Sequence, residues 1–166
     1  MAEKELVIKE KLEHSGIFDF KGFYSFAHAW FKDELYGVVE KTYSEKVSGN
    51  ARDIEFEWTV TKKLSDYFKT EMKIEAKIKE LTDVEVEIDG QKKRMNKGKV
   101  SFEIDAALMI DPESKWDVNP FYRFLRDVYS KYVIPKRVDN MKNIIFKDVT
   151  TCKEEIKAFL ELSGRR

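Results

Sequence analysis

The chain has 166 residues, a length that suits one domain with a sizeable hydrophobic core. Its 31 basic and 31 acidic residues cancel, so no overall field attracts the protein to nucleic acid or to an anionic membrane. Hydrophobic residues make up 42% and aromatic residues 13%, with only seven glycines and three prolines, which excludes collagen-like repeats and Pro/Gly-rich disorder. No internal repeat or linker-like segment interrupts the sequence, and we predict a single domain over residues 1–166.

The cysteine content and the N-terminal residues indicate the cellular compartment. Cys152 is the single cysteine, which rules out an internal disulfide and a cysteine-based metal site. The N-terminal residues lack the apolar segment of a signal peptide, and the longest apolar stretch, Ala106–Ile110, is far shorter than a membrane span. We therefore expect a soluble, cytoplasmic protein with no transmembrane segment.

The first part of the chain, residues 4–33, predicts a strand followed by an aromatic helix. Alternation predicts a strand over residues 4–13, which Ser15-Gly16 should end. Asp19 can then serve as the N-cap of a helix up to Asp33. One face of this helix is apolar and mostly aromatic: Phe20, Phe23, Phe26, Ala27, Trp30 and Phe31.

Residues 35–110 predict an antiparallel meander. Residues 34–47 fit either a strand or a helix, and their β-branched and aromatic content favours the strand. Apolar and polar residues then alternate strictly over residues 54–61, 72–79, 84–88 and 100–110, which is typical of strands with one buried face. Asp89-Gly90 predicts a two-residue hairpin, and Asn96-Lys97-Gly98 predicts a further turn.

The C-terminal part, residues 119–163, predicts helices. Asp111-Pro112 should end the sheet, and Asn119-Pro120 is a favourable helix start. Pro135 should kink this first helix or separate it from a second one over residues 136–147. Thr151-Cys152-Lys153-Glu154 has the form of a capping box that opens a last helix. The first helix carries an apolar stripe: Phe121, Phe124, Leu125, Val128, Tyr129, Tyr132 and Val133.

These elements predict a two-layer α+β fold, in which helices pack on one face of a curved antiparallel sheet. The opposite face is rich in Lys, Glu and Thr and can remain in water. The element order resembles the helix-grip arrangement of the START and Bet v 1-like superfamily. That resemblance implies a curved sheet that grips the last helix and leaves an apolar cavity for lipids, sterols or other hydrophobic ligands.

Aromatic residues on the predicted inner faces are the candidate ligand-binding residues. They could line a cavity between sheet and helices, and the alternative interpretation is ordinary core packing. The Lys-rich segment 91–99 is a candidate anion or nucleic-acid contact, although a solvated hairpin tip explains it as well. The candidate ligand contacts are Phe26, Trp30, Trp58, Phe102 and Tyr129, and the candidate anion contacts are Lys92, Lys93, Arg94 and Lys97.

The sequence shows no catalytic constellation. His14 and His28 lack metal-ligand spacing, and a helix start beside Cys152 does not by itself make a reactive thiol. The strand-borne carboxylates lie on the face that we assign to water, and no nucleophile elbow, P-loop or glycine-rich dinucleotide motif occurs. We therefore predict no catalytic residue, no metal and no cofactor.

The sequence is compatible with three functions, of which it favours the first and supports the third least. The first is a non-enzymatic binding protein that holds a hydrophobic small molecule or a partner segment between sheet and helices. The second is a structural or adaptor protein with a filled core, which contacts another macromolecule or a second copy of itself through its surface. The third is an enzyme built on the helix-grip scaffold.

Overall fold

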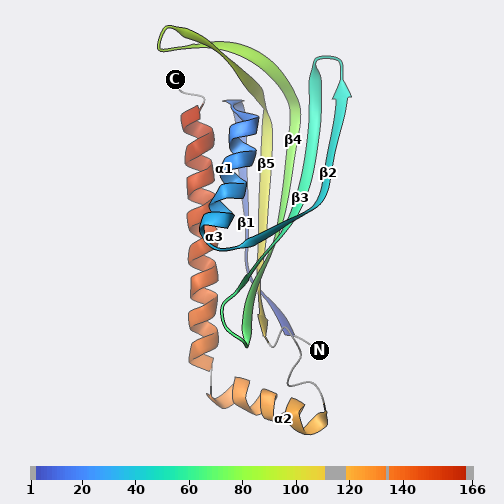
Figure 1. Cartoon of the computed structure of the whole chain (residues 1–166), viewed down its shortest axis with the longest axis vertical. Coiled ribbons are helices and arrows are strands. Elements are labelled where there is room, and N and C mark those ends of the chain that lie inside the picture. The colour runs from blue at the N-terminus through green and yellow to red at the C-terminus, as the bar shows by residue number, and fades with distance from the viewer. Residues whose placement is uncertain (1–2, 111–118, 134, 164–166) are drawn as a thin grey trace.

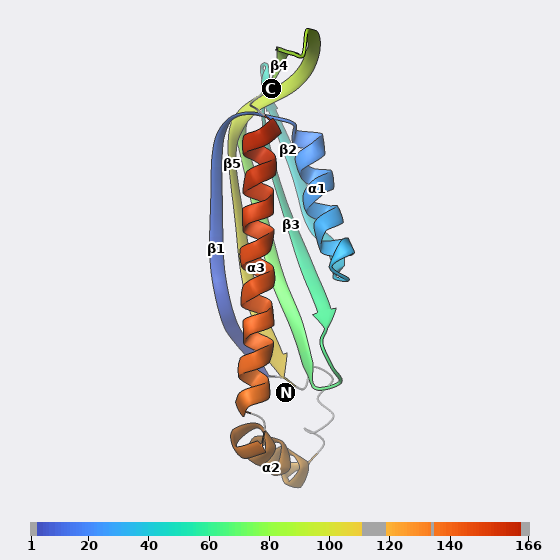
Figure 2. The same cartoon turned by 90° about the vertical axis from the view of Figure 1, so that its left-hand side faces the viewer.

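The computed structural model describes residues 3–110, 119–133 and 135–163. Its strands form one antiparallel sheet in the order β1-β5-β4-β3-β2, and helices cover one face (Figures 1 and 2). The predicted α+β class is confirmed, and the arrangement is compatible with a helix-grip fold. In chain order the elements are β1 (Glu3–Phe18), α1 (Phe20–Asp33), β2 (Gly37–Ser48), β3 (Ala51–Lys63), β4 (Phe68–Ile88), β5 (Gln91–Ile110), α2 (Pro120–Val128), the π-helical turn η1 (Tyr129–Val133) and α3 (Pro135–Ser163).

The alternating strands have one buried face and one solvent-exposed face, as predicted. On β3, Ile54, Phe56 and Trp58 are at most 2% exposed and point toward the helices. Their neighbours on the opposite face pair across strands, for example Lys79 with Glu55 at 3.4 Å. Such exposed pairs contribute only a few tenths of a kcal/mol each. The sheet therefore keeps its place mainly because its apolar face is buried against the helices.

The strands β4 and β5 are longer than the sequence indicated. The predicted segments 72–79 and 84–88 belong to one strand, β4, which bends at an irregularity between Lys79 and Thr82. The predicted turn at Asn96-Lys97-Gly98 is wrong, because these residues continue β5. Gly98 lets the backbone of β5 lie close to the backbone of β4, since a Cβ at this position would lie 3.0 Å from the Lys79 carbonyl oxygen. The predicted turn at Asp89-Gly90 is confirmed, with φ values of 50° and 78°.

The N-terminal elements follow the prediction with two differences. β1 continues through Ser15-Gly16 to Phe18, because Gly16 accommodates a φ of 135° within the strand. Asp19 is at the N-cap of α1, but its side chain makes no capping hydrogen bond. The Phe20 amide instead donates to Oδ1 of Asn96 on β5, at 3.0 Å. Residues 37–48 form a strand, as favoured over a helix.

The C-terminal helix α3 is one continuous helix of 29 residues. The predicted capping box at Thr151–Glu154 is wrong because it lies inside α3, whose buried stripe passes through it without a break. Pro135 is at the first position of α3, where no amide donor is needed, and so it separates two helices. The buried stripe consists of Ile145, Val149, Cys152, Ile156 and Leu160. The predicted strand end at Asp111-Pro112 lies outside the described residues.

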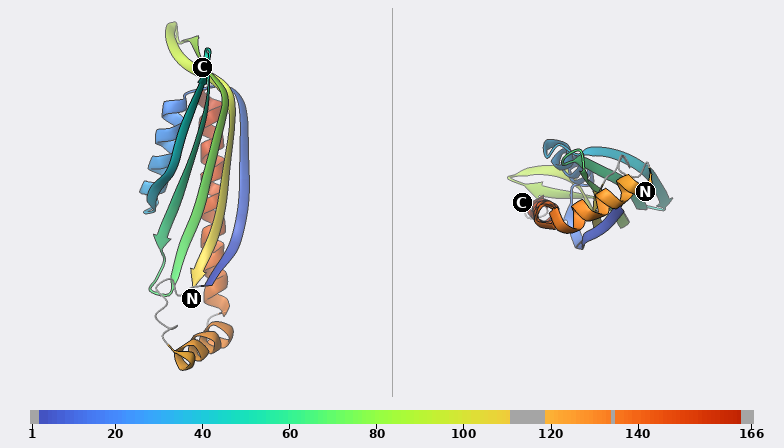
Figure 3. Two further views of the ribbon diagram at one scale, coloured as in Figure 1. Left: turned by 90° about the vertical axis from the view of Figure 1, so that its right-hand side faces the viewer. Right: turned by 90° about the horizontal axis from the view of Figure 1, so that it is seen from below.

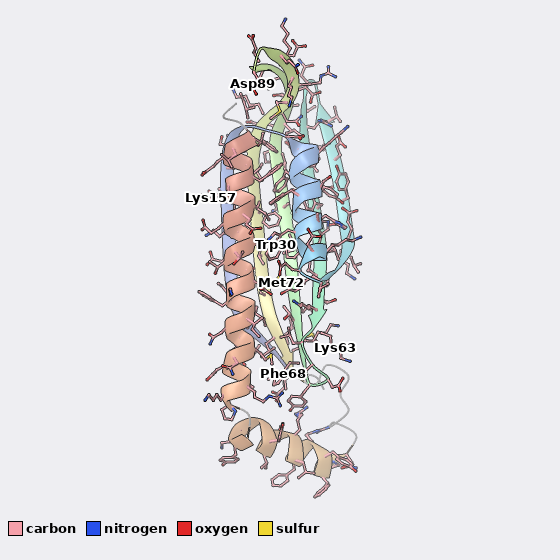
Figure 4. The ribbon with its side chains drawn as sticks, turned by 60° about the vertical axis from the view of Figure 1, so that its left-hand side comes forward. Trp30, Lys63, Phe68, Met72, Asp89 and Lys157 are labelled. Carbon is pink, nitrogen blue, oxygen red and sulfur yellow. The ribbon has the colours of Figure 1, made fainter. Side chains whose placement is uncertain are left out.

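The two covering helices divide the inner face of the sheet between them. α3 packs over β1 and β5, and α1 packs beside β2 and against α3 (Figure 2). The Phe23 ring of α1 meets Phe102 of β5 edge-on, with centroids 5.9 Å apart. The strands bend together along their length (Figure 3), and Figure 4 shows Met72 and Phe68 along the lower half of the sheet. The expectation that the helical residues 119–133 pack on the inner face of the sheet is wrong, because α2 lies beyond the lower end of the sheet (Figure 1).

Candidate functional site

The helix α2 begins where the sequence predicts. The Asn119 side chain accepts a hydrogen bond from the Tyr122 amide at 3.0 Å, and Pro120 occupies the first turn. Such a cap satisfies one of the amides that have no partner at a helix start. The apolar residues Phe121, Phe124, Leu125 and Val128 recur at spacings of three and four. They therefore form one stripe along α2.

The phenylalanines of the apolar stripe of α2 are exposed to solvent, whereas Leu125 and Val128 are half-buried. The buried residue of α2 is Arg126, which is 7% exposed and pairs with Asp127 at 3.2 Å and with Glu3 of β1 at 3.7 Å. By contrast, Phe121 is 65% exposed and Phe124 is 61% exposed. A surface helix ordinarily buries its apolar stripe and exposes its charges. We call the exposed aromatic set on α2 and η1 the aromatic face: Phe121, Tyr122, Phe124, Tyr129 and Tyr132.

Contacts among the described residues, of which we name two, join α2 and η1 to the rest of the molecule. The Tyr129 ring meets Tyr67, in the turn between β3 and β4, edge-on at 6.1 Å. The second contact is the pairing of Arg126 with Glu3. The aromatic face is thus held at one end of the elongated sheet, and its phenylalanines are exposed.

Basic residues are concentrated in the segment that carries the aromatic face. Between residues 119 and 140 the sequence has five basic residues and two acidic ones, although the whole chain is neutral. The Lys131 ammonium lies 5.3 Å from the centre of the Tyr132 ring. One of the acidic residues, Asp127, is already paired with Arg126. The exposed basic residues are Arg123, Lys131, Lys136 and Arg137.

A second polar site lies between α1 and α3. The Tyr36 hydroxyl donates to Oδ2 of Asp148 at 2.7 Å. Burial, and then this hydrogen bond to a carboxylate, raise the pKa of Tyr36, so the phenol stays protonated. Burial also raises the pKa of Cys152 well above its ordinary value, which keeps its thiol from acting as a nucleophile. An open groove of about 390 Å³ adjoins this site and is lined by Trp30, Glu34, Ile144, Lys147, Asp148 and Thr151.

A third cluster joins α1 to the edge strand β2. Oε1 of Glu40 accepts hydrogen bonds from the Tyr24 hydroxyl at 2.7 Å and from Nε1 of Trp58 at 3.4 Å. Burial and the Glu40 contact raise the pKa of Tyr24 to about 12. The Tyr24 ring meets Trp58 and Phe56 at 5.3 and 5.2 Å. Because the rings contact each other directly, this cluster fastens α1 to the sheet.

The predicted ligand contacts lie in separate places. Trp58 and Phe102 are at most 1% exposed beneath α1. Phe26 stacks on Phe159 of α3 at 4.8 Å. Trp30 borders the groove beside Asp148, and Tyr129 belongs to the aromatic face at the end of the molecule. The structure does not bring these five side chains together around one space.

Two of the four predicted anion contacts are opposite acidic residues across the hairpin, and Lys93 is opposite Val86. Arg94 is opposite Glu85 and Lys92 is opposite Glu87 in the register of β4 and β5. Lys97 is opposite Thr82, so the basic segment is only partly balanced. The Asp89-Gly90 turn fixes this register, and the acidic partners could have been found from the sequence by counting back from it.

The two histidines contact aromatic rings. His14 meets Phe18 edge-on at 5.9 Å, and His28 meets Trp58 at 5.6 Å. Across residues 3–110, 119–133 and 135–163, no group of three or more His, Cys, Asp or Glu side chains is placed to hold a metal ion. Within the same ranges, none of the helices combines the length and the apolar content that crossing a membrane requires.

Sequence reasoning recognised the apolar stripe of α2 and assigned it to the wrong place. The stripe was expected to cover the sheet, as amphipathic helices generally do. Pro135 indicates that this helix is separate from α3, but no local signal indicates where the helix lies relative to the sheet. Comparison with known proteins finds no matching protein family and no matching curated protein.

Proposed function

We propose that this chain is a non-enzymatic adaptor, with a filled core, that acts through its surface. The observation that carries this proposal is the packing of the inner face. Trp58, Ile74 and Ile104 are at most 1% exposed, and so are the buried residues of α3. A side chain that lined a ligand-sized cavity would retain surface accessible to water within that cavity. Along these described side chains there is no such surface, which supports a filled core.

The aromatic face supplies the candidate contact surface. Exposed aromatic side chains are enriched where proteins bind other molecules, and contiguous exposed apolar patches are uncommon on proteins that act alone. The basic residues beside it could orient a partner. An adaptor of this kind needs no catalytic group, in keeping with the protonated Tyr36 and Cys152 side chains.

The helix-grip arrangement supports a different proposal, the holding of a hydrophobic small molecule between sheet and helices. A ligand in the described part of that layer would have to displace tightly packed side chains such as Phe102. Partly buried apolar residues near the lower end of the sheet, among them Leu64 and Met141, could still admit one. We therefore keep this as the prediction to be tested against the adaptor.

Two measurements test the filled core. Native mass spectrometry of the purified protein should show the mass of the chain alone, whereas an adduct of a few hundred daltons would contradict the proposal. Ala76, 1% exposed, lies between Phe56 and Phe102 on the neighbouring strands. Ala76→Leu should cost about 1–3 kcal/mol in a filled core. The control, Ala29→Leu on the exposed side of α1, should change stability by less than about 0.5 kcal/mol.

A further inference from the structure

We propose that the aromatic face docks onto the surface of an anionic lipid bilayer, with the basic residues beside it contacting the lipid headgroups. This inference rests on the proposed function, because it names the partner of the surface described above. It is carried by three observations: the exposed side chains of the aromatic face, a local excess of basic residues, and the position of α2 at the end of the molecule.

The composition of α2 and η1 matches what a bilayer interface selects. Helices that lie in the interface plane have bulky apolar residues on one side and Lys or Arg on the other. In α2, Phe121 and Phe124 are exposed on one side. Arg123, two residues after Phe121 and two before Leu125, projects from the opposite side of the helix to these two residues. Tyr132 of η1 is 70% exposed. Tyrosine is among the residues that favour the headgroup level of a bilayer.

The charge of this region favours lipid over a second copy of the chain. In a two-fold symmetric dimer, each patch meets the same patch of the other subunit. The excess of basic residues in the segment 119–140 of one copy would then face the same excess in the other, and like charges at an interface oppose association. An anionic bilayer presents the opposite charge over a wide plane, and each Lys or Arg near it adds attraction.

The placement of α2 suits a flat partner. α2 lies across the lower end of the molecule, whereas α3 and the strands run along its length (Figures 1 and 3). If the protein approaches a bilayer with this end first, the axis of α2 lies in the bilayer plane. The sheet and the β4–β5 hairpin then extend away from the membrane. Phe121 and Phe124 can enter the interface without any rearrangement of the core.

Flotation with lipid vesicles tests this inference on the full-length protein. We expect binding to phosphatidylcholine vesicles that contain phosphatidylserine, and much weaker binding to phosphatidylcholine alone. The double variant Phe121→Ser and Phe124→Ser should weaken binding by about tenfold or more for each phenylalanine. Phe146→Ser is the matched control, because Phe146 is 53% exposed on α3 and far along the chain from α2, and it should bind as the wild type does.

A second pair of variants tests the role of charge. Lys136→Gln with Arg137→Gln should weaken binding to the anionic vesicles by about tenfold. Lys41→Gln with Lys46→Gln removes the same charge from exposed positions of β2, away from α2, and should leave binding unchanged. Added salt should weaken binding by the wild type more than binding by the variant without Lys136 and Arg137.

Three outcomes would overturn the inference. The first is a wild type that does not float with anionic vesicles. The second is equal binding by the wild type and the Phe121/Phe124 variant. The third is a wild-type dimer, measured by light scattering, that becomes monomeric in that variant, because a second copy would then cover the aromatic face. None of these results depends on how the core is packed. The filled core of the adaptor proposal is tested separately, by the mass measurement above.

Discussion

The hydrogen bond from Tyr36 to Asp148 should be a measurable part of the stability of the fold. Tyr36 follows α1, is 4% exposed, and contacts Phe31 with its ring edge at 5.9 Å. Its hydroxyl reaches the carboxylate of Asp148 on α3 at 2.7 Å. The bond therefore ties the segment that enters β2 to the long helix. Tyr36→Phe removes this bond and leaves the ring in place.

The expected cost follows from the charge and burial of the two groups. A hydrogen bond to a charged group contributes about 1.5–3 kcal/mol, and the lower end applies when water can solvate the remaining partner. Asp148 is only partly buried, so water can replace the lost hydroxyl. We expect Tyr36→Phe to lower the free energy of unfolding by about 1.5 kcal/mol. For a domain of this size, that corresponds to a fall in Tm of about 3–6 °C.

Urea denaturation of four proteins measures this contribution: the wild type, Tyr36→Phe, Asp148→Ala and the double variant. The two single changes should be coupled by about 1–2 kcal/mol, because each removes the same bond. Tyr43→Phe is the control, since Tyr43 is 46% exposed, and it should change stability by less than about 0.5 kcal/mol. A Tyr36→Phe protein as stable as the wild type, or a coupling near zero, would refute this reasoning.

Three further predictions follow from buried groups and close backbone contacts. The pKa of Tyr36 is raised in the folded state, so the unfolded chain loses this proton first as the pH rises. The contribution of Tyr36 to stability is therefore complete below about pH 10 and should fall above it by up to about 1.4 kcal/mol per pH unit. Tyr36→Phe should flatten this decline in alkaline denaturation curves, and an unchanged slope would contradict the prediction. Gly98→Ala should cost about 1–3 kcal/mol in urea denaturation, because the new methyl would lie 3.0 Å from the Lys79 carbonyl oxygen and 3.2 Å from the Leu81 Cα, and a wild-type midpoint would show that the backbone yields easily. Cys152, 1% exposed, should react with thiol reagents only as fast as the protein opens, and rapid labelling under native conditions would show that α3 detaches.

The sheet was predictable from the sequence because its strands depend on local alternation. Ile54, Phe56 and Trp58 alternate with charged or polar residues, and this pattern alone fixes which side of β3 is buried. The Asp89-Gly90 turn likewise needs only local conformation, since both residues adopt a positive φ.

The differences from prediction involve partners that are distant in the sequence. Asn96 and Gly98 look like turn residues, yet Asn96 caps α1 and Gly98 meets the backbone of β4. The apparent capping box at Thr151–Glu154 is overridden because the stripe of α3 continues on both sides of it. The aromatic face could not be predicted either, since only the folded chain shows that α2 reaches past the sheet. Local patterns say which residues can start or end an element, and tertiary contacts decide whether they do.

The open sheet has a consequence for how the protein behaves when molecules are crowded together. β1 and β2 are its two borders, and an unprotected border strand can template the addition of another chain and seed fibrils. Each border strand has a register shift, between Leu6 and Ile8 in β1 and between Glu40 and Thr42 in β2. Exposed lysines occur along both strands. The register shifts and the lysines make each edge strand a poor template for another strand. Amyloid-like stacking is therefore disfavoured, although each edge strand has a strand neighbour on one side only.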